Sequence, residues 1–426
     1  MKQSILFLLC SFLCLSTINA QLSTIGIIRQ KDSTGFYFKD QNGAKIEKLG
    51  NWVSARQFDE TGFTRVIKHD DGKKQHYLLD TLGNIYPIID QLEELNEQTL
   101  ALSLIDKGLE AFPTLIVAYP QLKFLWLSHN QITQLPSEIE QLENLVILDL
   151  KSNELDEIPK GIGHLEHLVS LNISHNQIEK IPVEIGQLKK LTSLKLSSNS
   201  ITDLPDEIGQ LEALFDLDLS HNKLTTIPSK IGQLKNLSNL KLVSNQINTL
   251  PVEVWQLKNL SYLGLGHNKL TKIPSAISEL TNLSKLDLAW NTLSLPNELW
   301  HLEHLSSLYL DFIKMRTVPA QIKGLQNLIC LRLSGNHLKE LPPEIGGLDK
   351  LVNLNISYNE LSVLPLEING LQQLEYLNVF NNQITSLPQE IVKLKHLTTL
   401  FLVNNPILES EQLQIKEWLP ECRIDF

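Results

Sequence analysis

Four of the twelve histidines, the side chains best suited to catalysis or metal binding near neutral pH, recur at one spacing. His129, His175, His221 and His267 are each 46 residues apart. If they stand on alternate strands of one sheet, their rings lie about 10 Å apart. Zinc–nitrogen bonds are about 2 Å long, so such rings are too far apart to share an ion. The spacing therefore predicts a solvated row of side chains and no metal site.

Motifs that carry catalytic chemistry are missing from the chain, which has no P-loop, GxSxG, HExxH or CxxC. We therefore expect a protein that is not an enzyme and needs no cofactor. The formal net charge of −11 predicts that phosphate backbones are repelled, which excludes nucleic acid as a partner. Apolar residues make up 42% of the chain, enough to bury a sizeable core.

The first twenty residues have the layout of a secretory signal peptide. Lys2 precedes an apolar run over residues 5–15, and the small residue Ala20 marks the expected cleavage site. That run is too short to span a bilayer, which takes about 20 residues, and no later segment is long and apolar enough. We expect a monomeric mature protein without a membrane span, which is secreted, periplasmic or held at the cell surface.

Asparagine and proline recur with a period of 23 residues over most of the chain. Proline follows most of these asparagines by six residues, and Leu-x-x-Leu-x-Leu precedes them. The asparagines form two in-phase series, Asn130, Asn153, Asn176, Asn199, Asn222, Asn245, Asn268 and Asn291, then Asn336, Asn359, Asn382 and Asn405. A fixed period of this length is typical of solenoids, in which each repeat buries its apolar face against the next.

The unit LxxLxLxxNxLxxLPxxIxxLxx resembles the leucine-rich-repeat family, in the LPxxI subclass that includes secreted bacterial proteins. This resemblance implies an α/β solenoid, a horseshoe with a concave parallel β-sheet. It also implies that the concave face binds another macromolecule.

Each position of the unit has a physical role. Alternating Leu-x-Leu makes a short strand with leucines on one face. The asparagine amide can satisfy backbone groups of its own coil and the next, and proline opens a short helical or extended turn. With a degenerate first unit that carries Lys107 in place of asparagine, we expect about 14 coils over residues 93–405. Residues 406–426 are expected to form a capping helix.

One unit departs from the period. Pro296 follows Asn291 by five residues instead of six, and the next unit has Ile313 at the asparagine position. Isoleucine cannot supply the amide bonds of the ladder. We therefore expect a local irregularity there, either simple drift of one unit or a functional feature.

Residues 21–92 lack the period and contain two similar aromatic-rich segments, residues 35–43 and 76–84, each ending in a glycine-containing turn. Such segments predict β-hairpins. The whole resembles the bacterial WG-type hairpin repeat, although the Trp-Gly pair is missing. We expect a small all-β hairpin domain at residues 21–92.

Aromatic residues gather at strand positions in the C-terminal half of the array, with an arginine nearby. Such residues dominate binding hot spots, so we predict a partner site there. The predicted partner-binding residues are Tyr262, Asp287, Trp290, Tyr309, Phe312, Arg332, Tyr358, Tyr376 and Phe380. They favour a secreted recognition protein for a protein or glycan ligand. The alternative is a structural or adhesive cell-surface spacer that presents the N-terminal β domain.

Overall fold

The computed structural model describes residues 28–32, 35–40, 42–58, 61–70 and 73–426. The predicted signal peptide at residues 1–20 lies outside the described residues. The chain divides into two compact units, residues 1–218 and 219–426, and each is described by itself.

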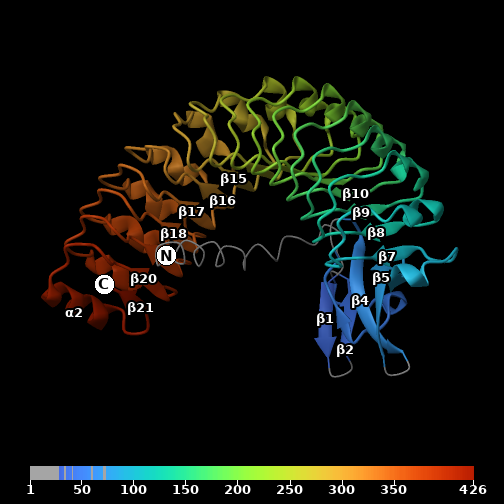
Figure 1. The fold of residues 1–426 in the computed structure, drawn as a ribbon. Coiled ribbons are helices and arrows are strands. Elements are labelled where there is room, and N and C mark those ends of the chain that lie inside the picture. Colours follow the sequence, from blue (N-terminus) through green and yellow to red (C-terminus); the bar gives the residue numbers. More distant parts are fainter. Residues whose placement is uncertain (1–27, 33–34, 41, 59–60, 71–72) are drawn as a thin grey trace. The chain divides into compact units, whose positions relative to one another are not determined.

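The first unit begins with antiparallel strands and continues as a parallel sheet (Figure 1). β1 and β2 form a hairpin, and β3 to β6 form an antiparallel sheet. Its strands are β1 (Ile28–Asp32), β2 (Gly35–Lys39), β3 (Ser54–Ala55), β4 (Phe63–Asp70), β5 (Lys73–Asp80), β6 (Ile85–Ile89), β7 (Ala101–Ser103), β8 (Phe124–Trp126), β9 (Ile147–Asp149), β10 (Ser170–Asn172), β11 (Ser193–Lys195) and β12 (Asp216–Asp218).

Strand β6 connects the two kinds of sheet. It pairs antiparallel with β5 and parallel with β7, the first strand of the repeats. The N-terminal hairpins are therefore hydrogen-bonded to the first coil rather than tethered to it by a linker. The boundary at residues 92/93 and the WG-type resemblance stay predictions.

The second unit is a parallel sheet with one strand for each repeat, closed by a helix and a last strand. Its elements are β13 (Asn239–Lys241), β14 (Tyr262–Gly264), β15 (Lys285–Asp287), β16 (Ser307–Tyr309), β17 (Cys330–Arg332), β18 (Asn353–Asn355), β19 (Tyr376–Asn378), β20 (Thr399–Phe401), α2 (Glu409–Trp418) and β21 (Arg423–Asp425). No described helix is long and apolar enough to cross a membrane.

Behind each strand the chain returns through a five-residue 3-10 turn that follows the repeat proline. At Pro136, for example, φ is −68° and the carbonyl oxygen accepts the Ile139 amide hydrogen at 3.1 Å. Proline restricts φ to this range and so prepares the turn. The turns with this form are Thr114–Ala118, Ser137–Gln141, Lys160–His164, Val183–Gln187, Asp206–Gln210, Ser229–Gln233, Val252–Gln256, Ser275–Glu279, Asn297–His301, Ala320–Gly324, Pro343–Gly347, Leu366–Gly370 and Gln389–Lys393. Leucines and isoleucines of strands and turns fill the space between them, most of them with no exposed surface.

The repeat asparagines form a buried ladder in each unit. Asn153 is representative: its Nδ2 donates to the carbonyl oxygens of Leu127 in the preceding coil and Leu150 in its own. Its Oδ1 accepts the amide hydrogen of Ile132 at 3.0 Å. Each asparagine thus joins neighbouring coils, and buried backbone groups that would otherwise lack partners are satisfied. The repeat and the fold class are confirmed.

The expected irregularity at Ile313 is present and local. Lys314 has a φ of +64°, so this coil has a second left-handed residue two positions after the usual one, Phe312. The Ile313 amide hydrogen is donated to Asn336 of the following coil. The strands nevertheless stay in register, because β15 pairs with β16 and β16 with β17 over their whole lengths. The shortened repeat is absorbed behind the sheet.

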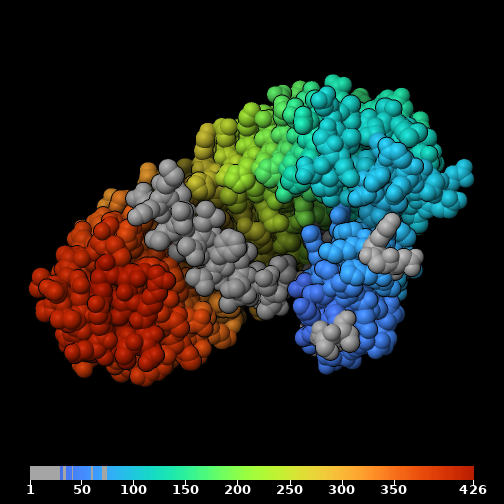
Figure 2. All heavy atoms as spheres, turned by 60° about the horizontal axis from the view of Figure 1, so that its bottom comes forward, coloured from blue at the N-terminus to red at the C-terminus, as the bar shows by residue number. Residues whose placement is uncertain are grey.

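In the first unit, the N-terminal hairpins pack on the strands of the first coils, as Figure 2 shows for the blue and cyan segments. Phe124 is 1% exposed and contacts the rings of Phe63 and Tyr86 at 5.1 and 4.9 Å. Trp126 and Ile147 belong to the same buried cluster. The sheet face of these coils is therefore apolar because the hairpins cover it.

Candidate recognition surface

Four residues on consecutive strands β14 to β17 of the second unit form an alternating row of rings and cations, called here the cation–aromatic row. The Lys285 Nζ atom lies 4.8 Å from the ring centroid of Tyr262 and 5.1 Å from that of Tyr309. On the other side of Tyr309, the Arg332 guanidinium carbon is 5.3 Å from the same centroid. Each cation is within the range in which the ring quadrupole attracts it. The row presents rigid rings with fixed positive charge.

Two carboxylates set the electrostatics beside this row. Arg332 Nε lies 2.8 Å from Oδ2 of Asp311, whose side chain is buried. Burial raises the pKa of Asp311 to about 6, against the lowering effect of Arg332 and of the Ser334 amide. Burial lowers the pKa of Arg332, but the charge of Asp311 and of other neighbours raises it by more, so the pKa of Arg332 is raised overall. Burial also raises the pKa of Asp287.

A stack of three rings lies on the loops that follow the strands, called here the ring stack. His267 and Trp290 have centroids 4.9 Å apart, and Trp290 and Phe312 have centroids 3.9 Å apart, with interplanar angles of 14° and 17°. Trp290 is 40% exposed, which is unusual for so large a ring. The two larger rings flank a hollow of about 440 Å³ that Lys269 also lines.

The ring stack arises from one position of the repeat, the residue directly before the ladder asparagine. This residue adopts a left-handed φ between +52° and +59° in nearly every coil, including the four evenly spaced histidines. The histidines are exposed, as the spacing suggested. In the ring stack the same position carries His267, Trp290 and Phe312, and the following coil has Gly335. A Cβ on Gly335 would lie 2.2 Å from the Phe312 ring, so glycine makes room for it.

The structure brings five of the nine predicted residues into these two clusters, a sixth beside the row, and places the other three apart. Tyr262, Tyr309 and Arg332 belong to the row, and Trp290 and Phe312 to the stack. Asp287 ends β15 beside the row, where it pairs with Tyr309 on β16 and accepts the Ala289 amide hydrogen. The other three lie elsewhere: Tyr358 and Phe380 pair edge-to-face at 5.0 Å, and Tyr376 is buried against Phe401.

Sequence reasoning missed two residues that shape this surface, Lys285 and the buried Asp311. Lys285 is at an ordinary strand position, and only the structure shows that it bridges two tyrosines. Asp311 occupies a position where Ser220, Ser334 and Ser357 stand in other coils. The replacement of a serine hydroxyl by a carboxylate at this repeat position could have marked the coil as unusual.

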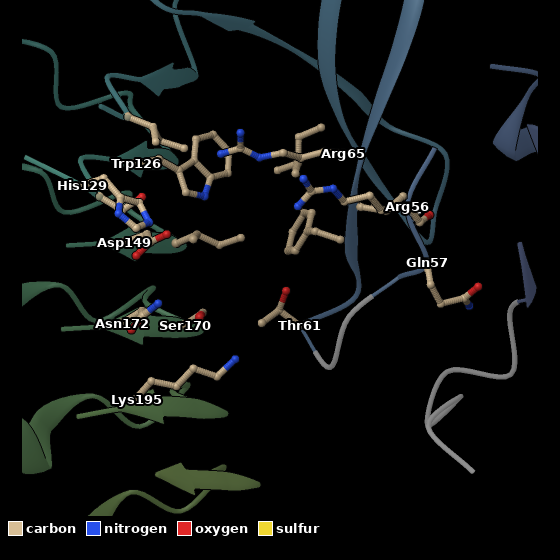
Figure 3. Close-up of a pocket in the computed structure, with 16 residues that line it drawn as sticks. Arg56, Gln57, Thr61, Arg65, Trp126, His129, Asp149, Ser170, Asn172 and Lys195 are labelled. Carbon is tan, nitrogen blue, oxygen red and sulfur yellow. Dashed lines mark hydrogen bonds between the residues drawn. The ribbon is translucent and has the colours of Figure 1, made fainter. Parts of the chain in front are cut away.

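A second hollow, of about 500 Å³, lies in the first unit between the N-terminal hairpins and strands β8 to β11. Figure 3 shows Arg56 and Arg65 pointing from the hairpin side toward the strands, and Lys195 pointing back from β11. The charged residues of its lining are three cations and one carboxylate, Asp149. The sequence alone did not predict this hollow, because it is formed by segments without a shared period.

Among the described residues, no group of three or more histidine, cysteine, aspartate or glutamate side chains is placed to hold a metal ion.

The fold is that of a leucine-rich-repeat solenoid, because each coil has a strand of a parallel sheet on one side, a 3-10 turn on the other and a ladder asparagine between them. Family models agree: a leucine-rich repeat region matches residues 114–198, 170–244 and 214–315, and other leucine-rich repeat models match residues 327–348 and 350–407. The chain belongs to the leucine-rich-repeat family. Proteins of this fold commonly bind other proteins. A comparison with curated protein sequences finds no match.

Solved structures similar to the chain come from bacteria and plants. A leucine-rich-repeat protein of Leptospira interrogans is 38% identical with a TM-score of 0.69, over 80% of this chain and 99% of that one. An internalin of Listeria monocytogenes is 25% identical with a TM-score of 0.56, over 73% and 82%. The ectodomain of the Arabidopsis receptor kinase HAESA, solved with a peptide hormone ligand, is 27% identical with a TM-score of 0.57, over 76% and 59%.

Proposed function

We propose that the protein is a secreted, non-catalytic recognition protein that binds a protein partner through the cation–aromatic row and the ring stack. The observation that carries this proposal is the row itself. Lys285 sits between two tyrosine rings and Arg332 beside the second, so four side chains on four strands are held in one arrangement. Such preorganisation lowers the entropy lost on binding. Tyrosine, tryptophan and arginine are also the types enriched in hot spots.

The chemistry of the surface indicates what the partner presents. Lys285 over two tyrosine rings favours a carboxylate, and the exposed edge of Trp290 favours an apolar or aromatic side chain. A protein segment with acidic and apolar side chains side by side meets both requirements. Support also comes from the HAESA ectodomain, which was solved with a peptide ligand. A glycan ligand remains the second possibility for this surface.

A cross-linking experiment tests where the partner docks. A photoreactive amino acid is placed at one of three exposed apolar positions in the full chain and exposed to extracellular and surface proteins of the source. The positions are Trp290 in the ring stack, Val252 on a 3-10 turn and Leu82 in the N-terminal β region, which are 40%, 67% and 72% exposed.

We expect one protein to cross-link strongly from position 290 and not from the matched control at position 252. Cross-linking from position 82 alone would contradict the proposal and favour the spacer that presents the N-terminal β domain.

A further inference from the structure

The hollow of the first unit contains a largely buried cation that lies over an aromatic ring. The Arg65 guanidinium carbon lies 4.3 Å from the ring centroid of Trp126. Among the described residues, no oxygen atom is hydrogen-bonded to the Arg65 guanidinium. Arginine keeps its charge in proteins, and burial lowers the pKa of Arg65, so an anion beside this guanidinium is favourable. A planar guanidinium held flat on an indole still presents its N–H groups at the edge, where they fit an oxyanion.

The rest of the lining adds positive charge. Arg56 directs a second guanidinium toward the same space, and Lys195 directs its ammonium from the opposite wall (Figure 3). This is a local excess of cations in a chain whose net charge is −11. The charge of Arg56 also lowers the pKa of Arg65, after the larger effect of burial. An anion placed between these groups relieves their repulsion.

A simple oxyanion does not satisfy the whole site, because Asp149 lines it as well. Burial raises the pKa of this carboxyl, while the Lys151 amide and Arg65 lower it. A carboxylate accepts hydrogen bonds and repels anions. The ligand must therefore carry hydrogen-bond donors beside its negative charge. Thr61, Ser170 and Asn172 add short polar side chains to the same lining.

We propose that this hollow binds an acidic sugar, a ring with a carboxylate and several hydroxyls, of the uronic-acid class. The carboxylate would lie at the edge of the Arg65 guanidinium near Arg56, and ring hydroxyls would donate to Asp149 and exchange hydrogen bonds with Ser170 and Asn172. The volume of about 500 Å³ is within the range of small-molecule sites, about 300–1,000 Å³, and holds one or two such rings. This site is in a different unit from the recognition surface, so each proposal stands or fails independently.

Titration calorimetry on the full mature chain tests the ligand class. The probes are D-galacturonate and D-glucuronate, with D-galactose lacking the carboxylate, glutarate lacking the hydroxyls, L-glutamate carrying an ammonium, and inorganic phosphate. We expect the uronates to bind at least about tenfold more tightly than every other probe, since each charge-assisted hydrogen bond lost weakens binding by about that factor. Digalacturonate distinguishes a polysaccharide end from a free sugar acid as the source.

Variants assign the binding to this hollow. Arg65→Met keeps an apolar stem on Trp126 and should lose at least about tenfold in uronate affinity. Asp149→Asn is nearly isosteric and should weaken uronate binding while sparing glutarate. Arg316→Met, at an exposed arginine of the second unit, is the matched control and should bind as the parent does. Thermal melts verify that each variant is folded.

The inference is overturned if no uronate binds the parent chain, or if Arg65→Met binds it as well as the parent does. It is also overturned if glutarate, glutamate or phosphate binds as tightly as the uronates.

Discussion

Replacing Asn336 with alanine should destabilise the chain more than the same change at any regular ladder position. Its Oδ1 accepts the amide hydrogens of Ile313 and Met315, and its Nδ2 donates to the carbonyl oxygen of Leu310. In a regular coil, a strand-end carbonyl such as that of Leu310 receives a second ladder donor from its own coil. Here that donor is missing, because isoleucine occupies the position. The substitution therefore leaves three backbone groups without their ladder bond.

Asn359→Ala is the matched control in a regular coil. The carbonyl oxygens of Leu333 and Ile356 accept from Asn359, but each also accepts from a neighbouring ladder asparagine. Only the Leu338 amide loses its acceptor. Both asparagines are buried, with 4% and 7% of their surfaces exposed, so removing the same side-chain volume has a comparable effect on packing at the two positions.

A buried backbone group without a partner costs about 1–3 kcal/mol. Asn336→Ala should therefore lower the free energy of unfolding by roughly 3 kcal/mol or more, and Asn359→Ala by about 1 kcal/mol. Urea unfolding measures both values, and amide hydrogen exchange should accelerate at residues 313 and 315 in the first variant. Equal destabilisation by the two substitutions would refute the reasoning that the interrupted ladder concentrates its bonds on one side chain.

Two further predictions concern the recognition surface. Burial raises the pKa of Asp311 to about 6, so the folded chain binds a proton at this carboxyl more tightly than the unfolded chain does. The resulting stabilisation is complete below the ordinary pKa of 3.8 and is lost as the pH rises through 6. The stability of the parent relative to Asp311→Asn should therefore fall between pH 4 and pH 7, by roughly 3 kcal/mol, and a flat difference in urea titrations would disagree. Gly335→Ala places a Cβ against the Phe312 ring at a φ of +67°, whereas Gly108→Ala has the same φ and nothing within 4 Å. We expect both substitutions to lower the free energy of unfolding by roughly 1 kcal/mol because of the left-handed φ, and Gly335→Ala to lower it by about 1–3 kcal/mol more. Gly335→Ala should also change the near-ultraviolet circular dichroism of the ring stack. Equal losses of stability in the two variants would contradict the contact with Phe312.

The repeat could be predicted from the sequence because each coil depends on local residues. Leucine spacing, proline and asparagine have the same role in every unit, so the early Pro296 and the isoleucine at position 313 were enough to locate the irregularity. The ring stack was partly predictable for the same reason, since Trp290 and Phe312 hold one repeat position in neighbouring coils.

The packing of the N-terminal hairpins was not predictable, because it joins segments without a common period. A signal was present in Phe124, Trp126 and Ile147, which are apolar at strand positions that are polar in the next coils. Such residues need a cover, but their types do not say which segment supplies it. The role of Lys285 was not predicted either, because its contact with two tyrosine rings depends on the distance between neighbouring strands, which the residue type does not give.

The central claim is that the cation–aromatic row binds the partner, and the affinity of a purified partner for Tyr309→Ala tests it most directly. Tyr309 contacts both cations of the row, so its loss removes the contact that joins them. Lys241→Ala on β13 is the control, at the strand position that Tyr309 holds on β16. We predict that Tyr309→Ala weakens binding about thirtyfold or more, as a hot-spot residue does, while Lys241→Ala has little effect and both variants keep the parent's melting temperature within a few degrees. Unchanged affinity in a folded Tyr309→Ala variant would contradict the account.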